Sequence, residues 1–222
     1  MTTKLEQLEP TKYGLALHTT TPDLGLAISN FAGDTRSGVW NLERELSSQL
    51  HKYLIEFIKP QTWADLEFIT VAAGPGGFTG TRIGVVTART LGQQLDIPVF
   101  AVSTLAAVTW SHLSSVPANT KEEQVIAVQM PAQQGQLFTA IYQYTANASG
   151  LRVLFPNTVL TPQAWQEKLA KWDTGYQLIE AKSGLAATVS SILELAYLEW
   201  QDGKRPNWSE ALPYYGQHPV TT

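Results

Sequence analysis

Five glycines fall within the eleven residues of segment 74–84, GPGGFTGTRIG, and this segment restricts the fold more than any other. The short apolar run 68–73 precedes it and is typical of a strand buried on both faces. Residues with helical spacing follow it. Glycine destabilises a helix interior by about 1 kcal/mol relative to alanine, so glycines inside this helix indicate positive φ or close backbone approach. We expect a buried strand, a tight loop and a closely packed helix.

The rest of the first half has the pattern of an α/β lobe. Residues alternate in character over 13–19, which predicts a strand with one buried face. Two more strands and a helix of about 42–58, ended by Pro60, are expected next. Helical spacing after the glycine segment continues through Leu95. The expected second strand, third strand, last strand and last helix of this half are 24–31, 35–42, 99–102 and 103–113.

The second half repeats the order strand, strand, strand, helix, strand. Thr161 is expected to cap its first helix, with Pro162 in the first turn. The repetition predicts a duplicated two-lobed α/β fold with mixed sheets flanked by helices, divided into residues 1–113 and 114–222. The C-terminal segment of the second lobe is expected to pack back on the first. The expected strands are 124–129, 137–144, 152–155 and 176–180, and the final helix is 186–200.

Composition narrows the functional classes. The net charge of -4 and the pI near 5.6 disfavour direct binding to a phosphate backbone, which depends on clustered Lys and Arg. The absence of cysteine excludes disulfides, thiolate metal sites and a cysteine nucleophile. The polar start of the chain and the lack of a long apolar run predict a cytoplasmic protein without a membrane span.

One interpretation of the glycine segment is a phosphate cradle at a helix N-terminus. A Walker A loop requires Lys and then Ser or Thr after its last glycine, whereas Gly80 is followed by Thr81 and Arg82. The dinucleotide pattern fails because Thr79 occupies the position of its third glycine. The spacing therefore disfavours a nucleotide site.

A second interpretation is helix packing. Gly80, Gly84, Ala88 and Gly92 recur every four residues and define one small-residue side of the helix. This side either packs against the protein's own sheet or receives a helix from a partner, with Arg82 and Arg89 flanking the contact. Spacing alone favours neither alternative.

The segment resembles the GPGSFTGxRIG signature of the TsaB (YeaZ) family, whose members have an actin-like (ribonuclease H-like) fold. Residues 102–105, VSTL, match a second family segment, and the similarity is specific in the first half and weak after Lys121. The resemblance implies a scaffold subunit that pairs with a TsaD-like catalytic subunit and a TsaE-like ATPase. That complex makes N6-threonylcarbamoyladenosine at tRNA position 37, so tRNA would reach this chain only indirectly.

In that family the partner contact involves the helices equivalent to 42–58 and the one that begins at Thr79. The resemblance thus favours a docking trough for a foreign helix, or for a second copy when the protein is isolated. Gly84→Leu or Ala88→Arg would then abolish association and leave the fold largely intact. The expected partner-binding residues are Leu46, Leu50, Tyr53, Leu54, Gly80, Arg82, Gly84, Val85, Ala88, Arg89 and Gly92, beside a signature loop of Gly74, Pro75, Gly76, Gly77, Phe78 and Thr79.

The chain departs from the pattern where actin-like ATPases hold metal and phosphate. His18 stands where the family segment usually has Asp, and imidazole does not replace a carboxylate as a hard oxygen ligand for Mg²⁺. Segment 131–136, PAQQGQ, lacks the charges of the family's D-A-R-x-G-E. We expect no catalytic residues, metal or cofactor, and a structural role for His18 in preference to a catalytic base.

Two other functions are weighed against the scaffold. No H-x-x-x-H pair occurs, so the chain does not match the catalytic TsaD relatives or a metalloprotease. A small ATP-dependent kinase or ATPase of the same superfamily is the main alternative, and it would need carboxylates that the sequence does not place.

Overall fold

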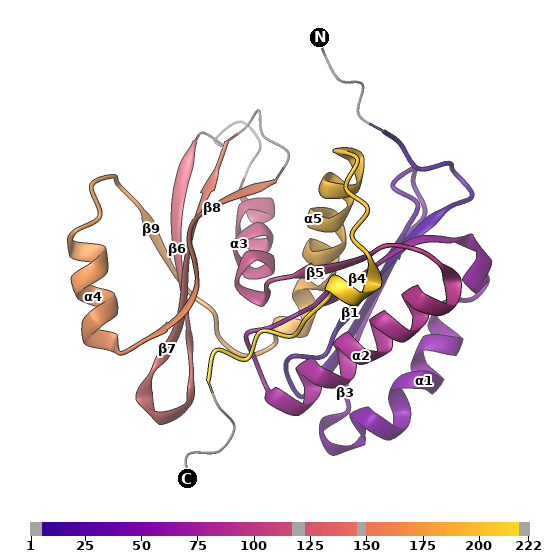
Figure 1. Ribbon diagram of the computed structural model, residues 1–222, viewed down its shortest axis with the longest axis horizontal. Helices are drawn as coiled ribbons and strands as arrows, with labels where there is room; N and C mark the ends of the chain where they lie inside the picture. Colours follow the sequence, from indigo (N-terminus) through magenta and orange to yellow (C-terminus); the bar gives the residue numbers. More distant parts are fainter. Residues whose placement is uncertain (1–5, 117–122, 146–149, 218–222) are drawn as a thin grey trace.

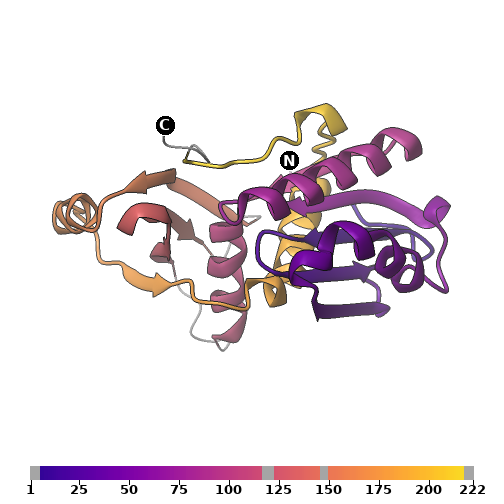
Figure 2. The same cartoon turned by 90° about the horizontal axis from the view of Figure 1, so that it is seen from below.

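The computed structural model describes residues 6–116, 123–145 and 150–217, and it has two α/β lobes side by side (Figure 1). The expected junction at 114–123 lies partly outside the described residues. Within the described part, none of the helices is both long enough and apolar enough to cross a membrane. The C-terminal segment runs back between the lobes along the first one, as both views show (Figures 1 and 2).

The first lobe is built on a five-stranded mixed sheet in the order β3-β2-β1-β4-β5. The central strand β1 pairs antiparallel with β2 and parallel with β4, so Leu15 lies between Ile28 and Ile69. Alternation along β1 sends Leu15 and Leu17 to one face and Ala16 to the other. The bounds are β1 Tyr13–His18, β2 Asp23–Ser29, β3 Thr35–Asn41, β4 Leu66–Ala72 and β5 Val99–Val102.

Helices cover both faces of this sheet. Helices α1 (Leu46–Phe57) and α2 (Phe78–Leu95) lie side by side on the face of Leu15 and Leu17 (Figure 2). Helix α5 (Val189–Gln201) comes from the second half of the sequence and covers the opposite face. The first lobe is therefore completed by a helix that the sequence analysis assigned to the second.

The second lobe repeats the arrangement with one strand fewer, in the order β8-β7-β6-β9. Helix α3 (Thr104–Ser115) covers one face through Leu105 and Val108. Helix α4 (Pro162–Ala170) covers the other through Trp165 and Leu169. The strands are β6 Gln124–Pro131, β7 Leu137–Tyr144, β8 Leu151–Leu160 and β9 Gln177–Glu180.

The predicted order of elements is confirmed, and several boundaries differ, three of them for identifiable reasons. Helix α1 starts at Leu46 because Glu43–Glu45 form a 3-10 turn and Glu43 has a φ of 44°. Strand β8 extends to Leu160, since Pro156 is tolerated on an edge strand. The final helix starts at Val189 after a short 3-10 helix. Thr161 caps α4 as predicted, accepting a hydrogen bond from the Ala164 amide at 3.2 Å.

The C-terminal segment, residues 203–217, contacts both lobes. On the first lobe, the Pro206 carbonyl accepts from the Val99 amide at 3.3 Å, and the Tyr214 amide donates to the Ala73 carbonyl at 2.7 Å. On the second lobe, the Tyr214 hydroxyl donates to the Asn157 carbonyl at 2.8 Å. We call this segment the tail, and these contacts tie the two lobes together.

Candidate functional site

The signature loop packs against the connection between β1 and β2. The Gly77 amide donates a hydrogen bond to the Thr20 carbonyl at 2.7 Å. A Cβ at Gly76 or Gly80 would collide with the carbonyl oxygens of Thr20 and Thr19 respectively. Carbonyl oxygens at the glycines repel an anion, so this geometry disfavours the phosphate cradle.

The first glycine of the loop, Gly74, allows the backbone of the tail to approach closely. Gly74 has a φ of 99°, and a Cβ there would collide with the Tyr214 carbonyl oxygen. The Gly74 carbonyl accepts from the Thr104 amide at 2.8 Å, which fixes the start of α3. Gly74 therefore joins β4, α3 and the tail at one point.

The predicted docking trough is wrong in its placement, because the small-residue side of α2 faces the protein's own chain. A Cβ at Gly84 would collide with the Thr19 hydroxyl, and one at Gly92 with the Val99 side chain. Ala88 is fully buried. The Thr19 hydroxyl also donates to the Gly80 carbonyl at 2.8 Å. The protein's own β1–β2 connection, β4, β5 and tail thus occupy the space that a foreign helix would need.

Most of the other predicted partner residues also lie in the core of the first lobe. Leu46, Leu50, Leu54 and Val85 are buried between the two helices and the sheet. Their spacing is that of an amphipathic helix, whose apolar stripe normally faces the core. Because these side chains are covered by the lobe itself, they are unavailable to a partner.

Among the predicted partner residues other than glycine, three retain some exposure. Arg82 is exposed on α2. Arg89 is half-buried and stacks on the ring of Trp208 from the tail, 5.7 Å from its centroid. Tyr53 is half-buried against Trp40, with ring centroids 5.1 Å apart. Of these, Arg82 is the one most available to another molecule.

The outward sides of α1 and α2 carry apolar residues that the sequence analysis missed. Ile55 is 51% exposed and Val86 is 54% exposed. Each lies off the buried stripe of its helix, which is the sequence signal that identifies it. We call the outward sides of α1 and α2, with Ile55, Arg82 and Val86, the outer helix face. It takes the place of the trough as the candidate partner surface.

His18 ends β1 in a fully buried position. Burial lowers the pKa of its imidazole to about 3. Neither ring nitrogen has a hydrogen-bond partner among the described residues. The side chain is therefore neutral at physiological pH and is sealed from solvent, which agrees with a structural role better than with proton transfer.

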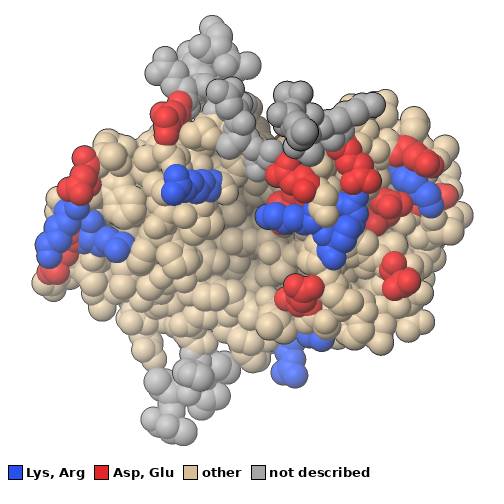
Figure 3. Space-filling model, turned by 45° about the horizontal axis from the view of Figure 1, so that its top comes forward, with Lys and Arg blue, Asp and Glu red and all other residues tan. Residues whose placement is uncertain are grey.

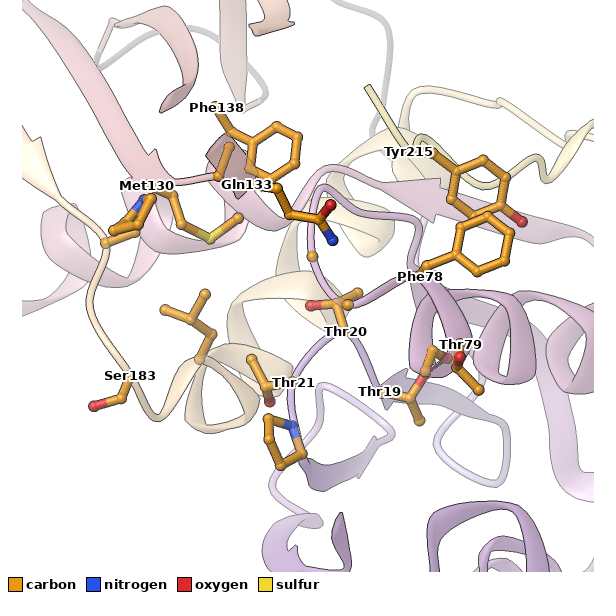
Figure 4. Close-up of a pocket in the computed structure, with 18 of the residues that line it drawn as sticks. Thr19, Thr20, Thr21, Phe78, Thr79, Met130, Gln133, Phe138, Ser183 and Tyr215 are labelled. Atoms are coloured by element: carbon orange, nitrogen blue, oxygen red, sulfur yellow. Dashed lines mark hydrogen bonds between the residues drawn. The ribbon is translucent and has the colours of Figure 1, made fainter. Parts of the chain in front are cut away.

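A cleft of about 1240 Å³ lies between the lobes, open to solvent and adjoining the signature loop (Figure 4). The first lobe contributes Thr20, Thr21 and Phe78, and the second contributes Met130 and Phe138. Among the described residues, His, Asp and Glu side chains nowhere gather in a group of three that could hold a metal ion.

The uncharged segment after β6 forms part of the cleft wall and is held by the tail. Gln217 accepts from the Gln133 amide at 3.0 Å and donates to the Gln133 carbonyl at 3.2 Å. It also donates to the Gln136 side chain at 2.6 Å. This segment is thus bonded within the protein by neutral groups.

Comparison with known proteins identifies relatives in tRNA threonylcarbamoyladenosine biosynthesis. A family model described as "TsaD: tRNA N6-adenosine threonylcarbamoyltransferase" matches residues 43–197. The tRNA threonylcarbamoyladenosine biosynthesis protein TsaB of Bacillus subtilis is 37% identical over 110 residues, which are 49% of this chain and 44% of that protein. Its counterpart in Buchnera aphidicola subsp. Acyrthosiphon pisum is 29% identical over 60% of this chain and 58% of its own length. The matches thus span about half of these relatives.

Solved structures agree on the fold. YeaZ from Pseudomonas aeruginosa aligns over 92% of this chain and 99% of its own, with a TM-score of 0.72 and 22% identity. An uncharacterised protein with similarity to peptidase YEAZ, also from Pseudomonas aeruginosa, aligns over 93% and 100%, with a TM-score of 0.74 and 21% identity. The predicted actin-like, two-lobed α/β fold is confirmed.

Proposed function

This chain belongs to the tRNA N6-adenosine threonylcarbamoyltransferase family and within it to the TsaB (YeaZ) type, and from this premise we propose that it is a non-catalytic subunit in tRNA threonylcarbamoyladenosine biosynthesis. Its role is to bind and support a TsaD-like catalytic subunit, together with a TsaE-like ATPase, in the cytoplasm. When the partner is absent, the chain forms a homodimer through the outer helix face, the surface proposed below for the TsaD-like subunit.

The non-catalytic role is supported most directly by the burial and neutral charge of His18. Its imidazole is buried, unpaired among the described residues and neutral, at the end of the strand where the superfamily places a metal-binding carboxylate. The uncharged segment 131–136 supports the same conclusion on the opposite side of the cleft. Mg²⁺ and phosphates need hard oxygen ligands and positive charge, and neither position supplies them.

The outer helix face is the proposed docking surface for the TsaD-like subunit. It combines exposed apolar side chains at Ile55 and Val86 with the cation of Arg82, a composition that suits the centre of an interface. Because a net charge of -4 disfavours contact with a phosphate backbone, we assign tRNA binding to the partner. On the side of the molecule seen in Figure 3, with the top of Figure 1 turned forward, acidic and basic side chains are interspersed, so no large patch of one charge marks a binding surface there.

Reconstitution of the modification reaction tests the proposal. We expect TsaD-like and TsaE-like proteins, ATP, threonylcarbamoyl donor and tRNA to yield modified adenosine only when this chain is added. Full modification without the chain would refute the supporting role. Hydrolysis of ATP by the chain alone would refute the non-catalytic role and favour the ATPase alternative.

A further inference from the structure

The tail, residues 203–217, is one of several links between the two lobes. The chain passes between the lobes from β5 to α3 and again from β9 to α5. In Figure 2 the tail (yellow) runs along one side of α3, and the connection that follows β9 (orange) runs along the other side. The tail therefore joins the lobes on the side of α3 that is opposite to this connection.

The lobes also meet where α3 packs on α5. Helix α3 belongs to the core of the second lobe, and α5 belongs to the core of the first. Ala107 and Ile192 are fully buried in this contact, and the Trp110 indole donates to the Glu194 carboxylate at 2.7 Å. Packed helices can slide past each other by small amounts, and short connections can absorb a rotation. The lobes can thus rotate about the α3–α5 contact, and a link on one side of it would limit that rotation.

The first-lobe end of the tail is held by backbone bonds and by burial. The Val99 amide on β5 donates to the Pro206 carbonyl at 3.3 Å, and the Tyr214 amide donates to the Ala73 carbonyl at 2.7 Å. Between these bonds, Ala211 is buried in the core of the first lobe. Backbone bonds to a sheet combined with core burial resist local opening. This end of the tail is therefore a firm attachment.

The second-lobe end of the tail is held by polar side chains. The Tyr214 hydroxyl donates to the Asn157 carbonyl at 2.8 Å. The half-buried side chain of Gln217 bonds the Gln133 backbone at 3.0 and 3.2 Å and the Gln136 side chain at 2.6 Å. Each of these bonds adds little net stability, because water replaces it when the tail lifts. This end of the tail is therefore the one that opens first.

We propose that the tail is a clasp that sets the angle between the lobes. Its first-lobe end stays attached, its second-lobe end releases, and release allows the lobes to rotate about the α3–α5 contact. This inference goes beyond the proposed function, because it concerns the motion of this chain by itself and requires no partner.

Distances between spin labels on the two lobes test the clasp. Because the chain contains no cysteine, labels can be attached at Lys52→Cys on α1 and Gln166→Cys on α4, two exposed positions in different lobes. We expect one narrow distance distribution in the labelled chain. Adding Tyr214→Phe and Gln217→Ala together removes the polar bonds to the second lobe and should broaden the distribution at least about twofold.

Two controls separate release of the clasp from general loosening. Tyr144→Phe with Gln177→Ala makes the same chemical changes on β7 and β9, outside the tail, and should leave the interlobe distribution unchanged. A second label pair, Arg152→Cys with Gln166→Cys, lies within the second lobe on β8 and α4. Its distances should be the same with and without the two tail substitutions.

Three results would overturn the clasp. The first is an unchanged interlobe distribution after the two tail substitutions, and the second is equal broadening in the β7 and β9 control. The third is broadening of the label pair within the second lobe, because the lobe itself would then have loosened.

Discussion

The two lobes share the order strand, strand, strand, helix, strand, but they join their loops to the rest of the protein in different ways. In the first lobe, Gly76 and Gly80 lie against the backbone carbonyls of Thr20 and Thr19, so no larger residue fits. In the second lobe, the loop after β6, which is the counterpart of the β1–β2 connection that holds Thr19 and Thr20, is bonded to the side chain of Gln217. The first lobe thus uses glycines where backbone meets backbone, and the second uses a side chain to make the corresponding contact.

This difference changes the meaning of the glycine segment. Its regular small residues suggest a binding feature, yet in the structure they are sites of close packing within the first lobe. A partner surface is then expected on the opposite side of the same helices, where Ile55 and Val86 are exposed. The following predictions test this contrast, beginning with the largest effect.

Gly84→Leu should destabilise the protein by about 4 kcal/mol or more, because the new side chain would overlap the Thr19 hydroxyl and crowd Val71. Gly175→Leu in the second lobe should change stability by less than about 0.5 kcal/mol, because no atom lies near its Cβ position. Urea unfolding of both variants measures the difference. A stable Gly84→Leu protein would restore the docking-trough interpretation.

Acid should destabilise the protein through His18. The folded-state pKa of about 3 lies below the usual 6.5, so the unfolded chain binds a proton between these values and the folded chain does not. The contribution of the neutral His18 to stability is fully present above pH 6.5. As the pH falls from 6.5 toward 3, the free energy of unfolding decreases by about 1.4 kcal/mol per pH unit. Unfolding measured across this range in the unmodified protein and in His18→Leu checks the contribution. Identical slopes in the two proteins would exclude it.

Tyr214→Phe should cost about 1 kcal/mol, because it removes the hydrogen bond from the tail to the Asn157 carbonyl while the ring remains. The change weakens the connection to the second lobe and leaves the Tyr214 amide bonded to Ala73 on the first. Hydrogen exchange should therefore become faster in the 150–160 region and not along β4. Equal changes in both lobes would argue against a local link.

Much of the fold can be predicted from residue spacing, because alternation and helical periodicity each reflect one buried face. The path of the tail could not, since Trp208, Tyr214 and Tyr215 follow no period and are placed by tertiary contacts. The extension of β8 past Pro156 could not be predicted from the sequence either, because proline usually argues against a strand.

The candidate site was harder to predict than the fold. Spacing shows that Leu46, Leu50 and Leu54 share one side of a helix, but a family resemblance assigned that side to a partner when it forms the core. The interlobe cleft joins residues more than a hundred positions apart, such as Phe78 and Tyr215, and no local pattern connects them.

The most direct test of the account compares two exposed valines, Val86 on the outer helix face at 54% and Val153 on β8 of the second lobe at 55%. Each is replaced by arginine, and the affinity for the TsaD-like subunit is measured by calorimetry. We predict that Val86→Arg weakens association by at least about tenfold, because a charge is buried at the interface, whereas Val153→Arg has no effect. Unchanged affinity in Val86→Arg, or an equal loss in Val153→Arg, would contradict the proposed docking surface.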